Sequence, residues 1–387
     1  MPFGRHRWVA AHNSSDLEIV EAARPREEFD AWLAEQVDIP LDGEHGPGWH
    51  LAVLPFTDGG TGVSLVVLHC LTDGVGLCEA LTEAALGRDN PISWPSPGSR
   101  GRWQALREDA GQTLRDIPAA GRAVVAAIRL ARRSRADAGP TETTTTPTVL
   151  SGADEPVAVP TATVLVDAEE WDARAHALGG TSNSLLVGFV ARLAQRVGRV
   201  ASDGSVVVGM PVNERADGDT RANAIGRTTV RVDPELATTD LREIRAAVKQ
   251  ALMRHGEVPD EEQAVNAIIP LLPKRFLGAT SRVGATDQVG SSNLGAVDPA
   301  ASRVDGTESD HLVIRGFPHR GLTEAMLNRF GGTHSLASGR ANGRVFICAH
   351  SYLPGRVNTN DLLQQDLSST LKDFSLTGTQ LGALRLA

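Results

Sequence analysis

Cysteine and lysine are scarce in this chain of 387 residues, and both shortages narrow the classes of protein to which it can belong. The three cysteines include no C-x-x-C pair, so they indicate neither a disulfide framework nor a zinc site. Lysine occurs only three times, and the formal net charge of −9 argues against a nucleic-acid-binding protein. No apolar run approaches the roughly 18 residues of a membrane span, and the first residues lack the apolar core of a signal peptide. The sequence therefore predicts a protein of the reducing cytoplasm.

Several motifs that define large enzyme classes are also missing. The glycine patterns G-x-G-x-x-G and G-x-x-x-x-G-K of nucleotide-binding proteins do not occur, and neither does the G-x-S-x-G of α/β-hydrolases. The 11 histidines include no H-E-x-x-H pair. We therefore expect no resident cofactor and no metal ion.

The most informative stretch is residues 63–85, where an apolar run ends in His69 and is followed by Asp73 and Gly74. The run predicts a strand buried on both faces, and reacting groups in such sheets usually lie just beyond a strand end. A neutral histidine there suits a general base acting on an alcohol or amine. Asp73 can fix the turn by accepting hydrogen bonds, and Gly74 allows a close backbone approach. The alternative is a structural histidine followed by an ordinary Asp-Gly turn.

This stretch resembles the active-site motif H-H-x-x-x-D-G of the CoA-dependent acyltransferase superfamily. That group includes peptide-synthetase condensation domains, wax ester synthase/diacylglycerol acyltransferases and polyketide-associated acyltransferases. His69 matches the catalytic histidine, Asp73 and Gly74 match in full, and Leu68 replaces the first, supporting histidine. Residues 40–49 are similar to the segment before the motif in wax ester synthases, and the D-F-G-W-G motif of condensation domains is absent. The resemblance thus favours the wax ester synthase branch, with a shorter N-terminal part than that family usually has.

Strands and helices are mixed in both halves of the chain, which predicts an α/β or α+β fold. Residues 136–160 are rich in threonine and proline and lack apolar periodicity, so we expect a linker between an N-terminal subdomain, 1–135, and a C-terminal subdomain, 161–387. The resemblance implies two chloramphenicol-acetyltransferase-like subdomains in a V-shaped pair, with the active site in a channel between them. Strands are expected at 7–11, 17–20, 51–56, 63–68, 162–166, 206–210, 227–232, 289–294, 312–316, 336–339 and 344–352. Helices are expected at 27–37, 75–85, 103–135, 169–178, 185–197, 240–255, 261–276 and 360–374.

Two polar stretches of the second half are similar to family positions near the catalytic histidine. Asn183 matches the first residue of an Asn-Asp pair, in which Ser184 replaces the aspartate. Its amide could donate to the oxyanion of a tetrahedral intermediate, or the residue could be the N-cap of the following helix. Ser292 and Asn293 match an S-N pair at a strand end, which implies hydrogen bonds to the acyl donor or the oxyanion. The alternative for this pair is a turn.

Arg215 ends the stretch P-V-N-E-R, which the resembling families share in similar form. It could be a solvated loop residue, a group lining the donor channel, or the partner of Asp73. We expect a structural role for Asp73, which would hold its turn through an arginine. Arg215 is the first candidate for that arginine and Arg227 the second.

Residues 103–135 predict a helix that is interrupted near Pro118 and is both apolar and arginine-rich in its second half. An ordinary surface helix with extended arginine side chains is one interpretation. The others are a peripheral contact with a membrane or lipid droplet, and an arginine patch for the phosphates of CoA.

These observations together predict an O-acyltransferase with acyl-CoA and an alcohol as its small-molecule substrates. His69 would remove the acceptor proton, and no acyl-enzyme is expected because no nucleophile accompanies the histidine. One alternative is a non-catalytic lipid- or carrier-binding homologue. The other is a condensation-type enzyme that uses carrier-protein thioesters.

Overall fold

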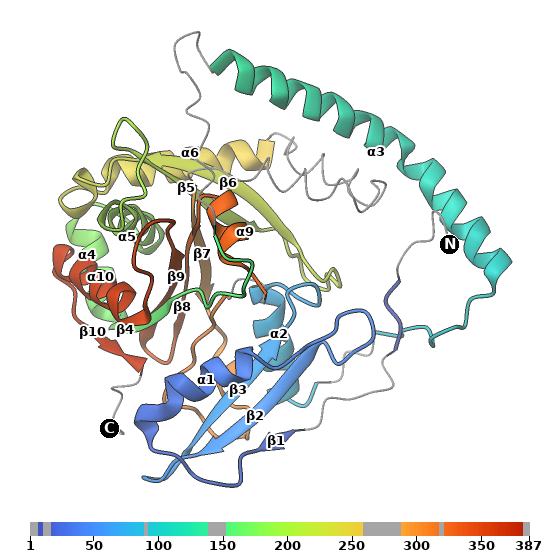
Figure 1. Ribbon diagram of the computed structural model, residues 1–387, viewed down its shortest axis with the longest axis horizontal. Coiled ribbons are helices and arrows are strands. Elements are labelled where there is room, and N and C mark those ends of the chain that lie inside the picture. The colour runs from blue at the N-terminus through green and yellow to red at the C-terminus, as the bar shows by residue number, and fades with distance from the viewer. Residues whose placement is uncertain are drawn as a thin grey trace.

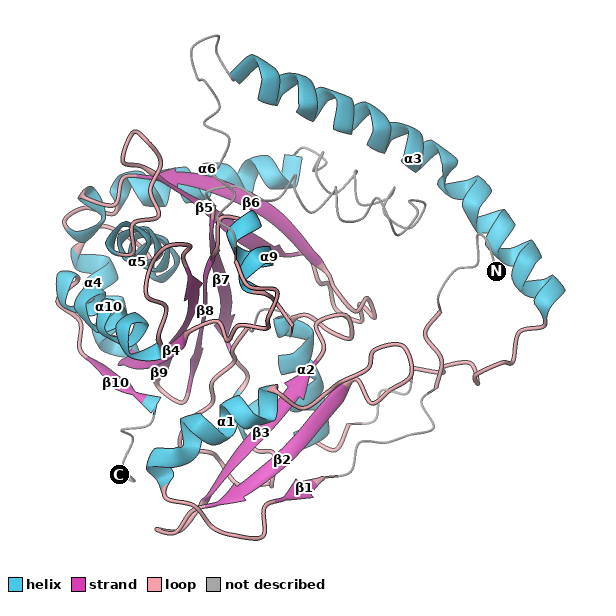
Figure 2. Ribbon diagram, viewed as in Figure 1, coloured by secondary structure: helices cyan, strands magenta, loops and turns pink. Residues whose placement is uncertain are grey.

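The computed structural model describes residues 7–10, 17–88, 92–137, 152–257, 288–316 and 321–381. These residues form two β-sheets of unequal size, each covered by helices (Figure 1, Figure 2). The mixed α/β fold with two subdomains is therefore confirmed. The helix predicted at 261–276 lies outside the described residues.

The N-terminal subdomain is built on a three-stranded sheet in the order β1-β2-β3. The predicted hairpin is present: β2 (Trp49–Pro55) and β3 (Thr61–Val67) pair antiparallel. Its turn contains Gly59 and Gly60, both at positive φ, where glycine is favoured. The short β1 (Glu18–Ile19) pairs with β2 in parallel. Helix α1 (Phe29–Val37), preceded by the short η1 (Arg26–Glu28), packs on the sheet.

The prediction that the strand before His69 is buried on both faces is wrong. Within the described residues β3 lies at an edge of the three-stranded sheet, and four of its apolar side chains are only half-buried. The apolar run reflects partial burial beside α1 and not a central position in the sheet. The chain turns at residues 69–71, and α2 (Gly74–Ala85) follows with Asp73 as its N-cap.

The C-terminal subdomain contains a seven-stranded sheet in the order β10-β4-β9-β8-β7-β5-β6. Strand β7 pairs in parallel with β5 and β8, and the other neighbours pair antiparallel. The strands are β4 (Thr161–Asp167), β5 (Val206–Asn213), β6 (Ile225–Val232), β7 (Val289–Ala296), β8 (Thr333–Ala341), β9 (Arg344–Tyr352) and β10 (Gly378–Gln380).

The main core lies between one face of this sheet and four helices. Phe189 of α5 is fully buried and contacts the rings of Trp171 and Phe374. Side-chain caps start these helices where the sequence has Asp or Thr, as for Asp167 and Thr181. The helices are α4 (Ala168–Ala177), α5 (Ser182–Arg196), α6 (Arg242–Glu257) and α10 (Asn360–Asp373), with the shorter η2 (Leu236–Thr238), η5 (Pro299–Ser302) and α9 (Glu324–Arg329) nearby.

A second apolar cluster joins the two subdomains. Phe346 and Cys348 of β9 are buried in it, on the face of the large sheet opposite the four helices. Leu33 of α1, and Cys78 and Leu81 of α2, pack against this cluster. The N-terminal helices therefore position the segment around His69 against the large sheet.

Three local predictions differ from the structure. Residues 7–10 and 312–316 contain no strand. The apolar character of 312–314 is explained by packing against the second cluster and not by strand pairing. Helix α3 (Arg102–Asp137) continues through Pro118 without interruption. None of the helices in the described ranges combines the length and the hydropathy that a bilayer span requires.

Residues 138–151 of the predicted linker lie outside the described residues. The part that follows runs beside the segment before α9, where the Val157 N–H donates to the Leu322 oxygen at 2.9 Å and Pro156 pairs with Thr323. The subdomain boundaries at 135 and 160 stay predictions.

Candidate active site

His69 lies in the turn between β3 and α2, and its side chain is exposed. The main chain of this turn is fixed by a hydrogen bond from the Leu71 N–H to the Leu68 oxygen at 2.8 Å. The Asn223 side-chain amide donates to the main-chain oxygen of His69 at 2.9 Å. Within the described ranges the imidazole itself makes no hydrogen bond or ion pair. The ring is therefore free to accept a proton from a bound molecule.

Asp73 is almost completely buried, with 3% of its surface exposed, and all of its hydrogen bonds are local or reach the C-terminal subdomain. One carboxylate oxygen accepts from the Gly76 N–H at 2.8 Å, which caps α2. The other accepts from Arg215 Nη2 at 2.7 Å and from the Ala224 N–H at 2.8 Å. The Asp73 N–H in turn donates to the Ala222 oxygen at 3.0 Å. Asp73 thus connects the turn of His69 to the loop between β5 and β6.

Arg215 organises that loop, residues 214–224, around the same carboxylate. Its Nη1 donates to the main-chain oxygens of Asp219 at 3.2 Å and Arg221 at 3.0 Å, and its side chain is only 5% exposed. The expected pair with Asp73 is present, so Arg215 is not a solvated loop residue. The second candidate, Arg227, instead donates to Gln288.

These contacts determine the protonation of Asp73. Burial by itself raises the pKa of a carboxyl group, but here it is outweighed by hydrogen bonds from the Ala224 and Gly76 N–H groups and from Arg215. The pKa of Asp73 therefore lies below its ordinary value. The group is charged at neutral pH, and its oxygens are occupied by donors that hold the turn.

Two glycines at the start of α2 allow this close packing. A Cβ at Gly74 would lie 2.5 Å from Leu294 Cδ2, at the end of β7. A Cβ at Gly76 would lie 2.5 Å from Thr72 Oγ1 and 2.9 Å from Arg215 Nη2. The Leu294 side chain can rotate away from an added methyl group, whereas the Arg215 guanidinium is held by four oxygens.

Gly76→Ala is therefore expected to destabilise the protein by about 1–3 kcal/mol through overpacking, despite the better helix propensity of alanine. The matched control is Gly111→Ala, because Gly111 is also helical but nothing lies within 4 Å of an added Cβ. The control should be neutral or slightly stabilising. Denaturant unfolding of both variants checks this, and equal effects at the two positions would show that Arg215 is not fixed over Gly76.

The structure brings two further predicted residues together. Asn293 Nδ2 donates to Asn183 Oδ1 at 3.1 Å, and Asn293 Oδ1 accepts from the Gly295 N–H at 2.9 Å. Asn183 is not the N-cap of α5, because Thr181 has that position and forms a capping box with Ser184. The Asn183 oxygen is thus occupied while its NH₂ group remains available as a donor.

The asparagine pair and the His69 turn lie on opposite faces of β7. Successive side chains on a strand alternate, so Ser292 and Leu294 share the face that packs on α2, and Asn293 lies on the α5 face. Within the described residues no hydrogen bond joins either asparagine to His69. Asn223 could not be predicted from the sequence, because a loop asparagine 154 positions from His69 has no spacing signal.

Three other histidines have environments that suit structural roles. His334 is buried and shares a 2.9 Å hydrogen bond with Ser351 Oγ, and burial lowers its pKa to about 3. Burial also lowers the pKa of His350 to about 4. His255 pairs with Glu214 at 3.0 Å. Among the described residues, no group of three or more His, Cys, Asp or Glu side chains could hold a metal ion.

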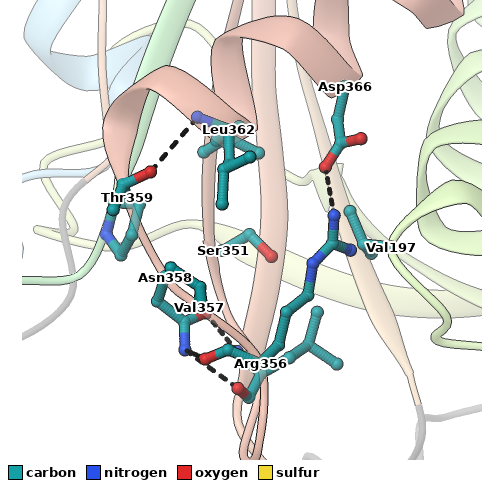
Figure 3. Close-up of a pocket in the computed structure, with 11 residues that line it drawn as sticks. Val197, Ser351, Arg356, Val357, Asn358, Thr359, Leu362 and Asp366 are labelled. Atoms are coloured by element: carbon teal, nitrogen blue, oxygen red, sulfur yellow. Dashed lines mark hydrogen bonds and ion pairs between the residues drawn. The ribbon is translucent and has the colours of Figure 1, made fainter.

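A small hollow of about 20 Å³ lies beside the start of α10, and none of the predicted site residues lines it (Figure 3). Its volume suffices for a water molecule. Arg356 crosses the hollow to Asp366 at 2.8 Å, and the Asn358 amide donates back to the main chain at 353 and 356. These bonds stabilise the turn between β9 and α10. The lining residues are Pro160, Val197, Ser351, Leu353, Arg356, Val357, Asn358, Thr359, Leu362, Leu363 and Asp366.

Comparison with known proteins identifies the fold but not the family. No protein-family model and no curated protein matches the sequence. Among solved structures, the chain is similar to the first condensation domain of the CDA synthetase, with a TM-score of 0.50 and 15% identity, covering 96% of this chain and 77% of that one.

Two further matches are weaker. The epimerization domain from the third module of tyrocidine synthetase B has a TM-score of 0.49 and 16% identity, over 92% of this chain and 78% of that one. Polyketide synthase associated protein 5 from Mycobacterium tuberculosis has a TM-score of 0.45 and 16% identity, over 92% and 80%. On the first match, the chain has the two-subdomain fold of a condensation domain, which is the chloramphenicol-acetyltransferase-like fold expected from the sequence.

Proposed function

We propose that this protein is an acyltransferase that moves an acyl group from a thioester, acyl-CoA, to an alcohol. His69 removes the hydroxyl proton while the alcohol oxygen attacks the thioester carbonyl. The carbon–sulfur bond then breaks, and the proton passes from His69 to the departing thiolate. The observation that carries this proposal is the exposed imidazole of His69, which forms no hydrogen bond or ion pair with the described residues. It lies on a turn whose main chain is bonded to the opposite subdomain.

The asparagine pair supplies a candidate for oxyanion stabilisation. Asn293 occupies the Asn183 oxygen, which orients the Asn183 NH₂ group as a donor. We assign that donor to the negative charge that develops on the carbonyl oxygen during attack. Ser292, on the face of β7 towards α2, is assigned to the acyl donor. The reaction needs no resident cofactor because the thioester is already activated.

Two observations bear on the identity of the acyl donor and of the acceptor. The motif around His69, and the lack of D-F-G-W-G, support acyl-CoA and an alcohol as in wax ester synthases. The similarity to a condensation domain supports a second candidate, in which the donor is a thioester on a carrier protein. Arg215 and Asp73 are assigned to holding the turn and not to substrate contact.

A substrate panel separates these candidates. The protein is incubated with acyl-CoA or acyl-carrier thioesters, each with alcohol or amine acceptors, and free thiol and product are measured by thiol titration and mass spectrometry. Equal amounts of free CoA and ester support the proposal. Turnover confined to carrier thioesters would instead establish the second candidate. Saturable acyl binding without turnover by any pair would show a non-catalytic homologue.

A further inference from the structure

Helix α3 presents large apolar side chains to solvent. It has 36 residues, which corresponds to about 54 Å, and it extends away from the two sheets (Figure 1). Among the described side chains of α3, six large apolar ones are exposed, and Trp103 is 84% exposed. The others are Leu106, Leu114, Ile117, Val124 and Val125.

These six side chains form one stripe, here called the apolar stripe of α3. At about 100° of rotation per residue they all fall within an arc of about 100°. The exposed arginines at 107, 115 and 122 occupy the adjoining arc on one side. The acidic residues Glu108, Asp109 and Asp116 lie on the opposite side of the helix.

Ion pairs fix the orientation of the first turns. Asp109 is 5% exposed and accepts from Arg100 at 2.7 Å, and Glu108 accepts from Arg7 at 2.8 Å. The acidic side of the helix therefore faces the segments that contain Arg7 and Arg100. The apolar stripe, on the other side, is left facing outward.

Charge decides which kind of surface fits this stripe. The whole chain has a net charge of −9, yet α3 contains eight arginines and four acidic residues, including Arg129, Arg132, Arg133 and Arg135 in its last turns. An apolar stripe flanked by arginines, with a tryptophan near its start, is typical of helices that lie in the plane of a bilayer surface. A second copy of this chain would face the same arginines with its own.

We propose that α3 binds the surface of an anionic lipid bilayer through its apolar stripe and the adjoining arginines. The stripe enters the boundary between head groups and acyl chains, and the arginines meet lipid phosphates. This surface is independent of the proposed acyl transfer, and it would bring the protein to a phase in which long-chain substrates concentrate.

Vesicle co-sedimentation tests this proposal with the full chain. Binding is expected to vesicles of mixed phosphatidylcholine and phosphatidylglycerol, and it should weaken markedly on pure phosphatidylcholine or at high salt. Leu114→Asp should weaken binding about tenfold or more, since it removes a large apolar side chain and adds a repelled charge. The matched control is Gln112→Asp, on the opposite side of the same turn, which should retain most of the affinity.

Circular dichroism and thermal melts of both variants establish that the fold is intact. Equal loss of binding in the two variants, or no binding to either vesicle, would overturn the proposal. Sedimentation velocity of the parent and of Leu114→Asp measures whether the stripe is a contact between two copies of the chain. If the parent is a dimer that Leu114→Asp dissociates, the stripe is a contact between copies of this chain and the membrane assignment is wrong.

Discussion

Replacing Asp73 by asparagine is expected to lower the free energy of unfolding by about 3–5 kcal/mol, because the buried Arg215 guanidinium loses its counter-charge. The amide of asparagine can still accept from the Gly76 N–H. Its NH₂ group, however, is a donor only, so it cannot replace the carboxylate oxygen that accepts from both Arg215 and the Ala224 N–H in the parent. Denaturant unfolding of the variant beside the parent measures the loss.

The control for this prediction is Asp203→Asn. Asp203 also accepts from a main-chain N–H and lies 3.4 Å from Arg231, but its side chain is 61% exposed. Water can replace its contacts, so the melting temperature should hardly change. A double variant, Asp73→Asn with Arg215→Gln, should cost less than the sum of the two single changes. If Asp73→Asn unfolds like the parent, the carboxylate does not hold the turn and a direct role at His69 has to be considered.

The same pair gives a pH dependence with a defined sign. Because the pKa of Asp73 is lowered in the folded protein, its stabilising contribution is complete above the ordinary carboxyl pKa of about 3.9. The contribution is lost as the pH falls from there through the lowered pKa. The stability difference between parent and Asp73→Asn should thus be constant near neutral pH and shrink in acid. A difference that grows in acid would contradict the assignment.

Replacing His69 by alanine is expected to reduce the rate of acyl transfer by about 10²–10⁴-fold, which is the usual contribution of a positioned general base. Its melting temperature should stay near that of the parent, since the exposed imidazole contacts no described residue by hydrogen bond or ion pair. The two variants are thus expected to differ. His69→Ala lowers the rate with little effect on stability, whereas Asp73→Asn lowers both the rate and the stability.

His176→Ala is the matched control. His176 is also exposed, but it lies on α4, which covers the face of the large sheet opposite to the face that α2 contacts. The control should transfer acyl groups at the parental rate. Equal rates for parent and His69→Ala, under conditions where the chemical step limits the rate, would remove His69 from the reaction.

The local signals in the sequence were sufficient for most of the fold. The hairpin of β2 and β3 followed from a glycine-rich turn between apolar runs, and both α2 and α4 begin at an aspartate that caps them. The strand predicted at residues 312–316 is absent, because an apolar segment can be buried as irregular chain as well as in a sheet. The helix interruption predicted near Pro118 is also absent, because a proline does not end every helix in which it occurs.

Long-range contacts of the site could be predicted only where a motif supplied them. The pairing of Asp73 with Arg215 was expected from two motifs 142 positions apart, and the structure contains it. The hydrogen bonds from Asn223 and Ala224 had no such signal, because they depend on how the 214–224 loop meets the turn. The contact between Asn183 and Asn293 likewise needed the positions of α5 and β7.

Imidazole rescue of His69→Ala is a direct test of whether His69 acts as the general base. The variant is mixed with acyl-CoA and alcohol at saturating concentrations, and ester formation is followed as free imidazole is added. We expect imidazole to restore ester formation in a saturable manner in His69→Ala and not to accelerate the parent. Ester formation that imidazole leaves unchanged in the variant, beside an active parent, would contradict the role of His69 as the general base.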